Sequence, residues 1–244
     1  MKRYLFLLIL LLISIASLPA LSADEIIQKM DEHQDFSSTI IKGSITRRDR
    51  FGELTSTYTA WAQGSDTFLL EFTSPAERGQ KILRLDNQLY LFYPSAQELI
   101  RLQGSALRQS LIGSDLSYED MSSHKNTLDV YDAKLLSSEI FNGRQCYVIE
   151  LSSKKRNVAY PIQKMWVDAT HYSLVKSEAF TASGRHLKSI EVEKTMMINN
   201  SVIAQKTLVI DQLKKNSSTT LEILSIEVDV PIEAHLFTLQ NLRW

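Results

Sequence analysis

Hydrophobic and polar residues alternate with a period close to two along most of the chain. Phe68, Leu70 and Phe72 fall on one face of such a segment, whereas Glu71 falls on the other. This alternation is typical of strands with one buried face, so we predict a mainly β protein. The predicted strands are 38–48, 54–63, a run around 68–72, 80–86, 88–93, 98–103, 133–141, 144–152, 162–168, 174–181, 185–197, 202–212 and 219–230.

Short turn sequences separate these strands. Asn142-Gly143 is a clear example, because Asn-Gly between alternating apolar runs favours a tight hairpin. The chain shows no internal repeat and no linker that would divide it. We therefore expect a single large, strongly curved antiparallel sheet of about eleven strands that forms an incomplete, half-open barrel.

Two stretches depart from the strand pattern. Residues 24–30 begin with acidic residues and place Ile26, Ile27 and Met30 on one face, which predicts a short amphipathic helix. Between Gly104 and Met121, apolar residues recur at helical spacing on both sides of a glycine. We predict two short helices with a glycine hinge, which cover the concave side of the sheet as a plug or lid. The apolar residues of this lid are Leu107, Leu111, Ile112, Tyr118 and Met121.

The first 23 residues have the features of a secretory signal peptide. A short basic start precedes an apolar run from Tyr4 to Ile15, and small residues follow this run. The run is shorter than the roughly 20 residues that a membrane-spanning helix needs, which favours a cleaved leader over an anchor. Cleavage could follow Ser22 or Ala23, and we predict that residues 24–244 form one domain. Asp24 stands where a lipoprotein would need cysteine, so no lipidation is expected there.

Composition narrows the classes of function. The chain has 244 residues, of which 44% are hydrophobic and 23% are charged, and this balance is typical of a folded protein. The 27 basic and 28 acidic residues give a net charge of -1, so charge does not favour a nucleic-acid partner. The single cysteine, Cys146, excludes an internal disulfide and a cysteine-based zinc site. An exported protein without disulfides suits the bacterial periplasm.

The sequence contains no arrangement typical of an active site. The five histidines are scattered without a His-Glu-x-x-His pattern. Neither a Gly-x-Ser-x-Gly nucleophile motif nor a glycine-rich phosphate loop is present. Glu119 and Asp120 are adjacent, which favours a structural cap or a surface role over an acid–base pair. We predict no catalytic residues, no metal site and no cofactor.

The segment Gly113-Ser114-Asp115-Leu116-Ser117-Tyr118-Glu119-Asp120-Met121 resembles the outer-membrane lipoprotein-sorting (LolA-like) superfamily, and within it a branch of uncharacterised periplasmic proteins. Arg84, residues 90–95, Arg101-Leu102 and the closing residues 236–242 are similar too, so the resemblance covers most of the mature chain. It implies a half-open barrel whose apolar interior accepts acyl chains of lipoproteins or lipids. Carriers of the family latch the helical cover with an arginine, which the sequence does not assign to Arg47, Arg48 or another position.

Two interpretations of the apolar positions stay open: they line a ligand cavity, or they fill an ordinary core. The resemblance favours the cavity. The predicted lipid-binding residues are then Ile26, Ile27, Met30, Phe68, Leu70, Phe72, Leu83, Leu85, Tyr90, Phe92, Leu107, Leu111, Ile112, Tyr118 and Met121.

The resulting hypothesis is a monomeric periplasmic carrier or chaperone for acyl chains of lipoproteins or lipids, without catalysis. The resemblance implies an inner-membrane transporter or exporter that loads it and an acceptor at the outer membrane. One alternative is a lipid-sensing accessory or regulatory subunit of an inner-membrane transporter or signalling protein. A secreted hydrolase is less favoured, because the usual motifs are absent.

Overall fold

The computed structural model describes residues 21–243 except 34, 65, 87, 123–125 and 157. These residues form one antiparallel sheet of thirteen strands, in the order β6-β5-β4-β3-β2-β1-β13-β12-β11-β10-β9-β8-β7. Residues 1–20 of the expected leader lie outside the described residues. The strands are β1 (Ser38–Asp49), β2 (Gly52–Gln63), β3 (Thr67–Phe72), β4 (Lys81–Leu85), β5 (Gln88–Tyr93), β6 (Glu98–Leu102), β7 (Tyr131–Phe141), β8 (Arg144–Ser153), β9 (Ile162–Asp168), β10 (Leu174–Phe180), β11 (His186–Ile198), β12 (Ser201–Asp211) and β13 (Ser218–Val228).

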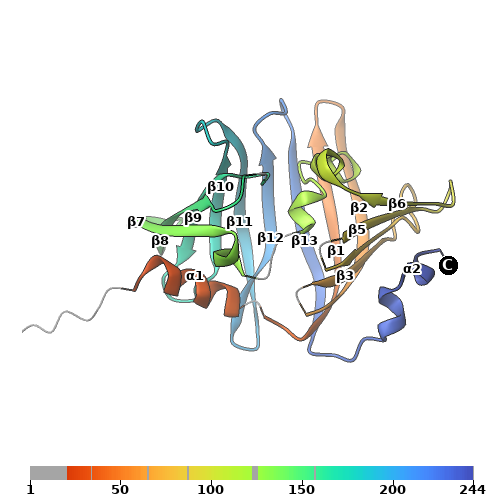
Figure 1. Ribbon diagram of the computed structural model, residues 1–244, viewed down its shortest axis with the longest axis horizontal. Coiled ribbons are helices and arrows are strands. Elements are labelled where there is room, and N and C mark those ends of the chain that lie inside the picture. The colour runs from red at the N-terminus through yellow and green to blue at the C-terminus, as the bar shows by residue number, and fades with distance from the viewer. Residues whose placement is uncertain are drawn as a thin grey trace, which may run out of the picture.

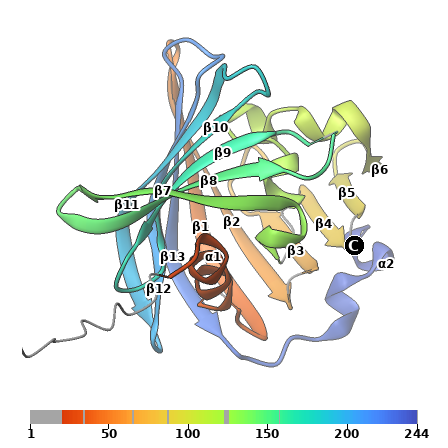
Figure 2. The same ribbon diagram turned by 60° about the vertical axis from the view of Figure 1, so that its left-hand side comes forward.

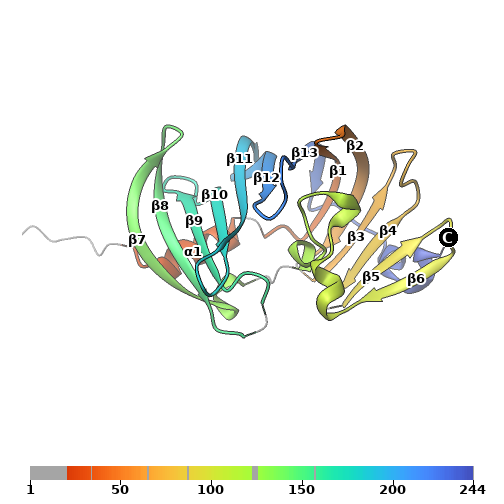
Figure 3. The same cartoon turned by 90° about the horizontal axis from the view of Figure 1, so that it is seen from above.

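The sheet consists of two meanders that join through their first and last strands. β1 pairs with β13 from Thr39 opposite Val228 to Arg48 opposite Ser218. β6 and β7 stand at the two ends of the strand order, so the sheet is not closed into a barrel. From above, the strands follow a curved wall whose two halves bend toward the same side (Figure 3). The mainly β, half-open architecture is confirmed, whereas the expected count of about eleven strands is too low.

A close approach explains the glycine in the middle of β1. Gly43 lies opposite Tyr58 of β2. A Cβ atom at Gly43 would lie 2.5 Å from the Tyr58 hydroxyl and 2.8 Å from the carbonyl oxygen of Glu222. Any larger residue would displace the tyrosine ring, so glycine at this position makes room for Tyr58. The register of the β1–β13 ladder also shifts at this point, between Lys42 and Gly43.

The N-terminal helix α1 (Ala23–Glu32) confirms the expected amphipathic helix. A capping box starts it: the Glu25 amide donates to the Ser22 hydroxyl, and the Glu25 carboxylate accepts from the Ser22 amide. Its buried face contains Ile26, Ile27 and Met30, which pack against the inner face of β8 and β9 (Figure 2). Ser22 and Ala23, which the sequence assigned to the leader, therefore take part in the first turn of this helix.

The segment between the two meanders, residues 104–130, is called the central segment below. It contains four 3₁₀ helices, η1 (Gly104–Arg108), η2 (Leu111–Gly113), η3 (Glu119–Ser122) and η4 (Thr127–Asp129), instead of the two expected helices. Backbone geometry explains this difference, because Gly104, Ile112 and Gly113 all have positive φ angles and interrupt a continuous helix. Figure 1 shows the segment in yellow-green against the sheet.

The C-terminal residues cover the other face of the first meander. The turn η5 (Ala234–Phe237) and the short helix α2 (Leu239–Leu242) bury Phe237 and Leu242 against Leu69, Leu83 and Phe92. The first meander is thus covered on both faces, by the central segment inside and by the C-terminal residues outside (Figures 1 and 3). None of the helices in the described part of the chain combines the length and the apolar composition needed to cross a bilayer.

Candidate functional site

The central segment closes the inner face of the first meander with a packed core. Leu111 is 1% exposed and Tyr118 is 4% exposed, and both contact a cluster that includes Leu70 and Phe72. Leu107, Ile112 and Met121 pack at the edge of the same cluster together with Phe68. These predicted lipid-binding residues therefore come together, but they fill the space between the segment and the sheet.

The remaining predicted residues lie elsewhere. The ladder pairs Leu83 with Leu69 and with Tyr90, which places them on the face opposite Leu70. Leu83, Leu85, Tyr90 and Phe92 consequently pack under the C-terminal residues. The expectation that they share one lining with Phe68, Leu70 and Phe72 is wrong, because strands of one sheet present their apolar residues to both covered faces. Ile26, Ile27 and Met30 belong to the core under α1.

A cavity of about 440 Å³ opens on the inner face of the second meander, next to the central segment. Its wall combines apolar side chains of β8 to β11 with residues of η3, η4 and the loop before β9. None of the predicted lipid-binding residues lines it. The lining residues are Glu119, Asp120, Thr127, Val130, Tyr131, Leu151, Val158, Ala159, Tyr160, Gln163, Met165, Leu174, Ser177 and Ile190.

The chemistry of this cavity is that of an apolar pocket with a few polar groups. Leu151, Met165, Leu174 and Ile190 supply its aliphatic wall, and the two tyrosines add aromatic surface. A volume of this size lies within the range of small-molecule sites, about 300–1,000 Å³. Such a wall removes hydrocarbon from water without selecting one chemical structure.

A buried polar cluster borders the cavity where the central segment meets the second meander. Asp120 accepts a hydrogen bond of 2.6 Å from the Tyr160 hydroxyl, forms an ion pair with Lys188 of β11, and accepts from the Ser117 amide at 2.7 Å. Burial, followed by the nearby Asp120 carboxylate, raises the pKa of Tyr160. The neutral phenol is thus the donor in this cluster, and it ties the loop before β9 to the segment.

Asp115 forms a second tie between the central segment and the sheet. This carboxylate is 2% exposed and accepts hydrogen bonds from the hydroxyls of Ser217 at 2.9 Å and Thr219 at 2.7 Å. The Asp115 amide in turn donates to the Thr219 hydroxyl at 2.8 Å. Asp115 therefore fastens the segment to β13.

Arg47 provides a third tie. Its guanidinium donates to the backbone carbonyl of Ile112 in η2, and a Cβ atom at Gly113 would lie 2.8 Å from the Arg47 Nη1 atom. Arg48, the other arginine considered, instead pairs with Glu53 on the surface, where both side chains are largely exposed. Among these two candidates, the structure identifies Arg47 as the arginine that contacts the central segment.

The far end of the central segment contacts α1. The Thr127 amide and hydroxyl donate to the two carboxylate oxygens of Asp31, at 2.9 and 3.0 Å. Asp31 is partly buried, and this burial raises the pKa of its carboxyl group. The segment is therefore held at β1, β13, β11 and α1, and it bridges both meanders.

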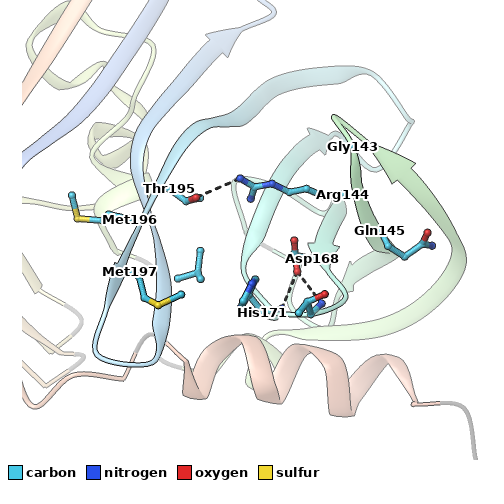
Figure 4. A pocket seen from close by; sticks show the side chains of 10 residues that line it. Gly143, Arg144, Gln145, Asp168, His171, Thr195, Met196 and Met197 are labelled. Carbon is cyan, nitrogen blue, oxygen red and sulfur yellow. Dashed lines mark hydrogen bonds between the residues drawn. The ribbon is translucent and has the colours of Figure 1, made fainter.

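A separate, more polar pocket of about 550 Å³ lies between the β7–β8 hairpin and the β11–β12 hairpin (Figure 4). Asp168 accepts hydrogen bonds from the amides of Thr170 and His171, both at 2.8 Å, and Arg144 reaches Thr195 at 3.4 Å. Asp168 and Arg144 are thus both engaged in hydrogen bonds within the pocket. In the described ranges, no group of three or more His, Cys, Asp or Glu residues is arranged to hold a metal ion.

The apolar residues of β8 are the signal in the sequence that could have indicated the cavity. Cys146 and Val148 face outward beside Trp166, whereas Ile149 and Leu151 face inward. Apolar residues on both faces of one strand indicate that both faces are covered. The partners of Tyr160 could not be found in this way, because Asp120 lies 40 positions away and Lys188 lies 68 positions from Asp120.

Comparison with known proteins defines the class of fold. A LolA superfamily protein from Nitrosomonas europaea has a TM-score of 0.75 and 26% identity, with 91% of this chain and all (100%) of that chain covered. A putative outer membrane lipoprotein-sorting protein domain from Vibrio parahaemolyticus has a TM-score of 0.83 and 20% identity, covering 91% and 98% of the two chains. A DUF1329 family protein from Desulfovibrio piger has a TM-score of 0.84 and 21% identity, covering 90% and 97%.

The fold and the covered inner face thus define a LolA-like protein. Residues 64–244 match the model of a family described as an uncharacterised protein, and the chain belongs to this family, a branch of the LolA-like superfamily. No curated protein sequence matches the chain. The resemblance noted for residues 113–121 is therefore confirmed at the level of the superfamily.

Proposed function

We propose that the protein is a periplasmic carrier or chaperone that binds an acyl chain of a lipoprotein or lipid in the cavity beside Tyr160. The observation that carries this proposal is the apolar cavity of about 440 Å³ on the inner face of the second meander. The LolA-like fold supports it, because two of the structural neighbours are described as lipoprotein-sorting or LolA superfamily proteins. No catalytic step is part of the proposal.

The energetics of an aqueous crossing explain why such a cavity is useful. Each methylene group exposed to water costs about 0.8 kcal/mol, so an acyl chain of a dozen methylenes would cost roughly 10 kcal/mol. Leu151, Met165, Leu174 and Ile190 offer the chain an apolar surface instead. Transfer from a bilayer to such a surface exchanges one apolar environment for another, so loading and release can both proceed.

The central segment supplies a means of access. It is held over the inner face by polar contacts of Arg47, Asp115 and Asp120, each of which joins it to a different strand or loop. Polar contacts such as those of Asp120 can exchange for water when the part of the segment beside the cavity moves, while the apolar contacts of Leu111 and Tyr118 hold its other part on the first meander. A membrane donor and a membrane acceptor are the partners that this proposal requires.

Native mass spectrometry of protein purified from the periplasm tests the proposal. We expect a lipid or lipidated protein to remain bound, and displacement of a fluorescent fatty-acid probe to give a measurable affinity. Leu174→Trp fills the cavity and should weaken probe binding at least tenfold. Leu136→Trp on β7 is the matched control, because Leu136 is 42% exposed and does not line the cavity.

Three outcomes would contradict the proposal. An empty protein that binds no acyl probe would exclude a carrier of acyl chains. If Leu174→Trp binds the probe as tightly as the wild-type protein does, the cavity is not the binding site for the acyl chain. Binding without transfer between donor and acceptor vesicles would indicate the sensor role instead of the carrier role.

A further inference from the structure

A second hollow of about 350 Å³ lies directly beside the apolar cavity. It is formed by the central segment, the loop before β9, and the strands β11 and β12. Glu119, Ala159 and Tyr160 line both spaces. Tyr160 therefore stands in a wall that the two spaces share, with Asp120 on the cavity side and Lys188 on the side of the second hollow.

The two spaces differ in chemistry. Hydrocarbon dominates the wall of the cavity, whereas Ser110, Ser117 and Thr181 line the second hollow. Their hydroxyls already form hydrogen bonds with Lys214, Asp120 and Ser183, and each keeps a further lone pair that can accept a hydrogen bond from a ligand. A ligand with an apolar chain and a polar head would match both walls only when it spans Tyr160. The phenol of Tyr160 lies at the boundary, because this residue lines both spaces.

The charged groups of the second hollow already have partners. Arg108 lies 3.5 Å from Glu119, Lys188 pairs with Asp120, and Asp115 accepts from Ser217 and Thr219. Asp211 accepts from the Leu213 amide at 2.9 Å. A ligand phosphate would have to displace an existing carboxylate from Arg108 or Lys188. An uncharged head that donates and accepts hydrogen bonds needs no such exchange.

We propose that the second hollow is the head-group compartment of the acyl-chain site, and that it takes an uncharged, hydroxyl-bearing head such as a glycerol ester. This inference rests on the proposed function, because it assigns the chain of the same ligand to the apolar cavity. The ligand passes Tyr160 with its ester group at the boundary between the two walls.

Competition binding with three probes of equal chain length tests this assignment. The probes are methyl laurate, 1-monolauroylglycerol and lauroylglycerol phosphate, each displacing a fluorescent fatty acid from the full mature chain. We expect wild type to bind the glycerol ester about tenfold more tightly than the methyl ester, which corresponds to one or two added hydrogen bonds. The phosphate should give no further gain.

Leu213→Trp is the variant that fills the second hollow. Leu213 lines the hollow and is 53% exposed, so a larger side chain can be accommodated without entering the core. The preference for the glycerol ester should fall below about twofold, with the methyl ester affinity unchanged. Leu224→Trp is the matched control, since Leu224 is 61% exposed and lines neither space. Ser110→Trp fills the same hollow from the central segment if Leu213→Trp does not fold.

The results separate the two proposals. If wild type binds none of the three probes, the proposed carrier function fails. If wild type binds the methyl and glycerol esters equally, or if the filled variants keep the preference, the head-group compartment is wrong while the carrier function stands. Tighter binding of the phosphate than of the glycerol ester also overturns it, because the hollow would then recognise an anion.

Discussion

The two meanders share one continuous sheet but differ in what covers their inner faces. On the first meander, Leu111 and Tyr118 of the central segment interlock with the sheet residues Leu70 and Phe72 in a packed core. On the second meander, α1 covers only part of the face, and the remainder borders a cavity. Similar strands thus build a packed core in one half and leave a cavity in the other, depending on the segment that lies over them.

The outer faces differ in the same way. The C-terminal residues cover the first meander with Phe237 and Leu242. On the second meander, Trp166 is 4% exposed although no helix lies over it, because Lys164 and Lys176 lie across its ring, 4.6 and 4.5 Å from its centroid. The ammonium groups of the two lysines, one of which pairs with Glu178, thus take the place of a covering element there, together with the neighbouring ring of Phe141.

The largest expected effect concerns packing in the first meander. Phe72→Ala should lower the free energy of unfolding by about 3–5 kcal/mol, because Phe72 is 0% exposed and its removal leaves a cavity in a packed core. Leu174→Ala, which enlarges an existing cavity in the second meander, should cost only about 1–2 kcal/mol. Urea denaturation measures both values, and equal losses would contradict the contrast between the two halves.

The second effect concerns the ion pair that borders the cavity. Lys188→Met should lower the free energy of unfolding by about 3 kcal/mol, because it leaves the Asp120 carboxylate without its cation in a site where both side chains are at most 13% exposed. Lys154→Met is the control: Lys154 lies 3.5 Å from Asp132, but both are exposed, and the change should be below about 1 kcal/mol. A small loss for Lys188→Met in urea denaturation would show that water reaches the pair.

The third effect appears at alkaline pH. Burial raises the pKa of Tyr58 to about 12, above the value near 10 of an unfolded chain. The folded protein then retains a proton that the unfolded chain loses, so this contribution to stability is full below about pH 10 and is lost as pH rises toward 12. The loss for Tyr58 alone should be about 1–3 kcal/mol.

Tyr58→Phe removes the ionisable group and should flatten the stability profile measured by denaturation between pH 10 and 12. Tyr131→Phe in the second meander serves as the comparison, because burial also raises the pKa of Tyr131 but its hydroxyl borders the cavity and donates to the Tyr160 carbonyl. An unchanged profile for Tyr58→Phe would mean that water reaches this phenol in the folded state.

The smallest effect distinguishes the two neighbouring arginines. Arg47→Ala removes a charge-assisted hydrogen bond to the central segment and should lower the free energy of unfolding by about 1–2 kcal/mol. Arg48→Ala removes only an exposed ion pair with Glu53 and should change it by less than about 0.5 kcal/mol. Thermal or urea denaturation compares the two, and equal losses would assign no special role to the Arg47 contact.

The sequence predicted the elements better than the site. Every predicted strand corresponds to an observed one. Successive side chains of a strand point to opposite faces of the sheet, so an alternation of apolar and polar residues indicates a strand directly. The fifteen predicted lipid-binding residues rest on this alternation in the strands and on helical spacing elsewhere, and the structure divides them among three cores. Alternation shows that a residue faces a covered side, but it does not show which element covers that side or whether the cover fills the space.

The residues around the cavity show what the periodicity of the sequence does not predict. Tyr160 lies in a loop, Asp120 in η3 and Lys188 in β11, so no periodic pattern connects them. The segment 113–121, which carries the family resemblance, contains both Asp115 and Asp120. Only the contacts of these carboxylates with β13, β11 and the loop before β9 show that the segment is fastened to both meanders.

Local chemistry in the chain determined the strands, the capped helix α1 and the interrupted central segment, because pleating, capping and positive φ angles depend on neighbouring residues. Tertiary structure alone decided which faces became core and which became cavity. That outcome depends on the fit between segments far apart in sequence, such as Leu111 on Phe72 and Tyr160 on Asp120, and the fit of two surfaces is not encoded in either one separately.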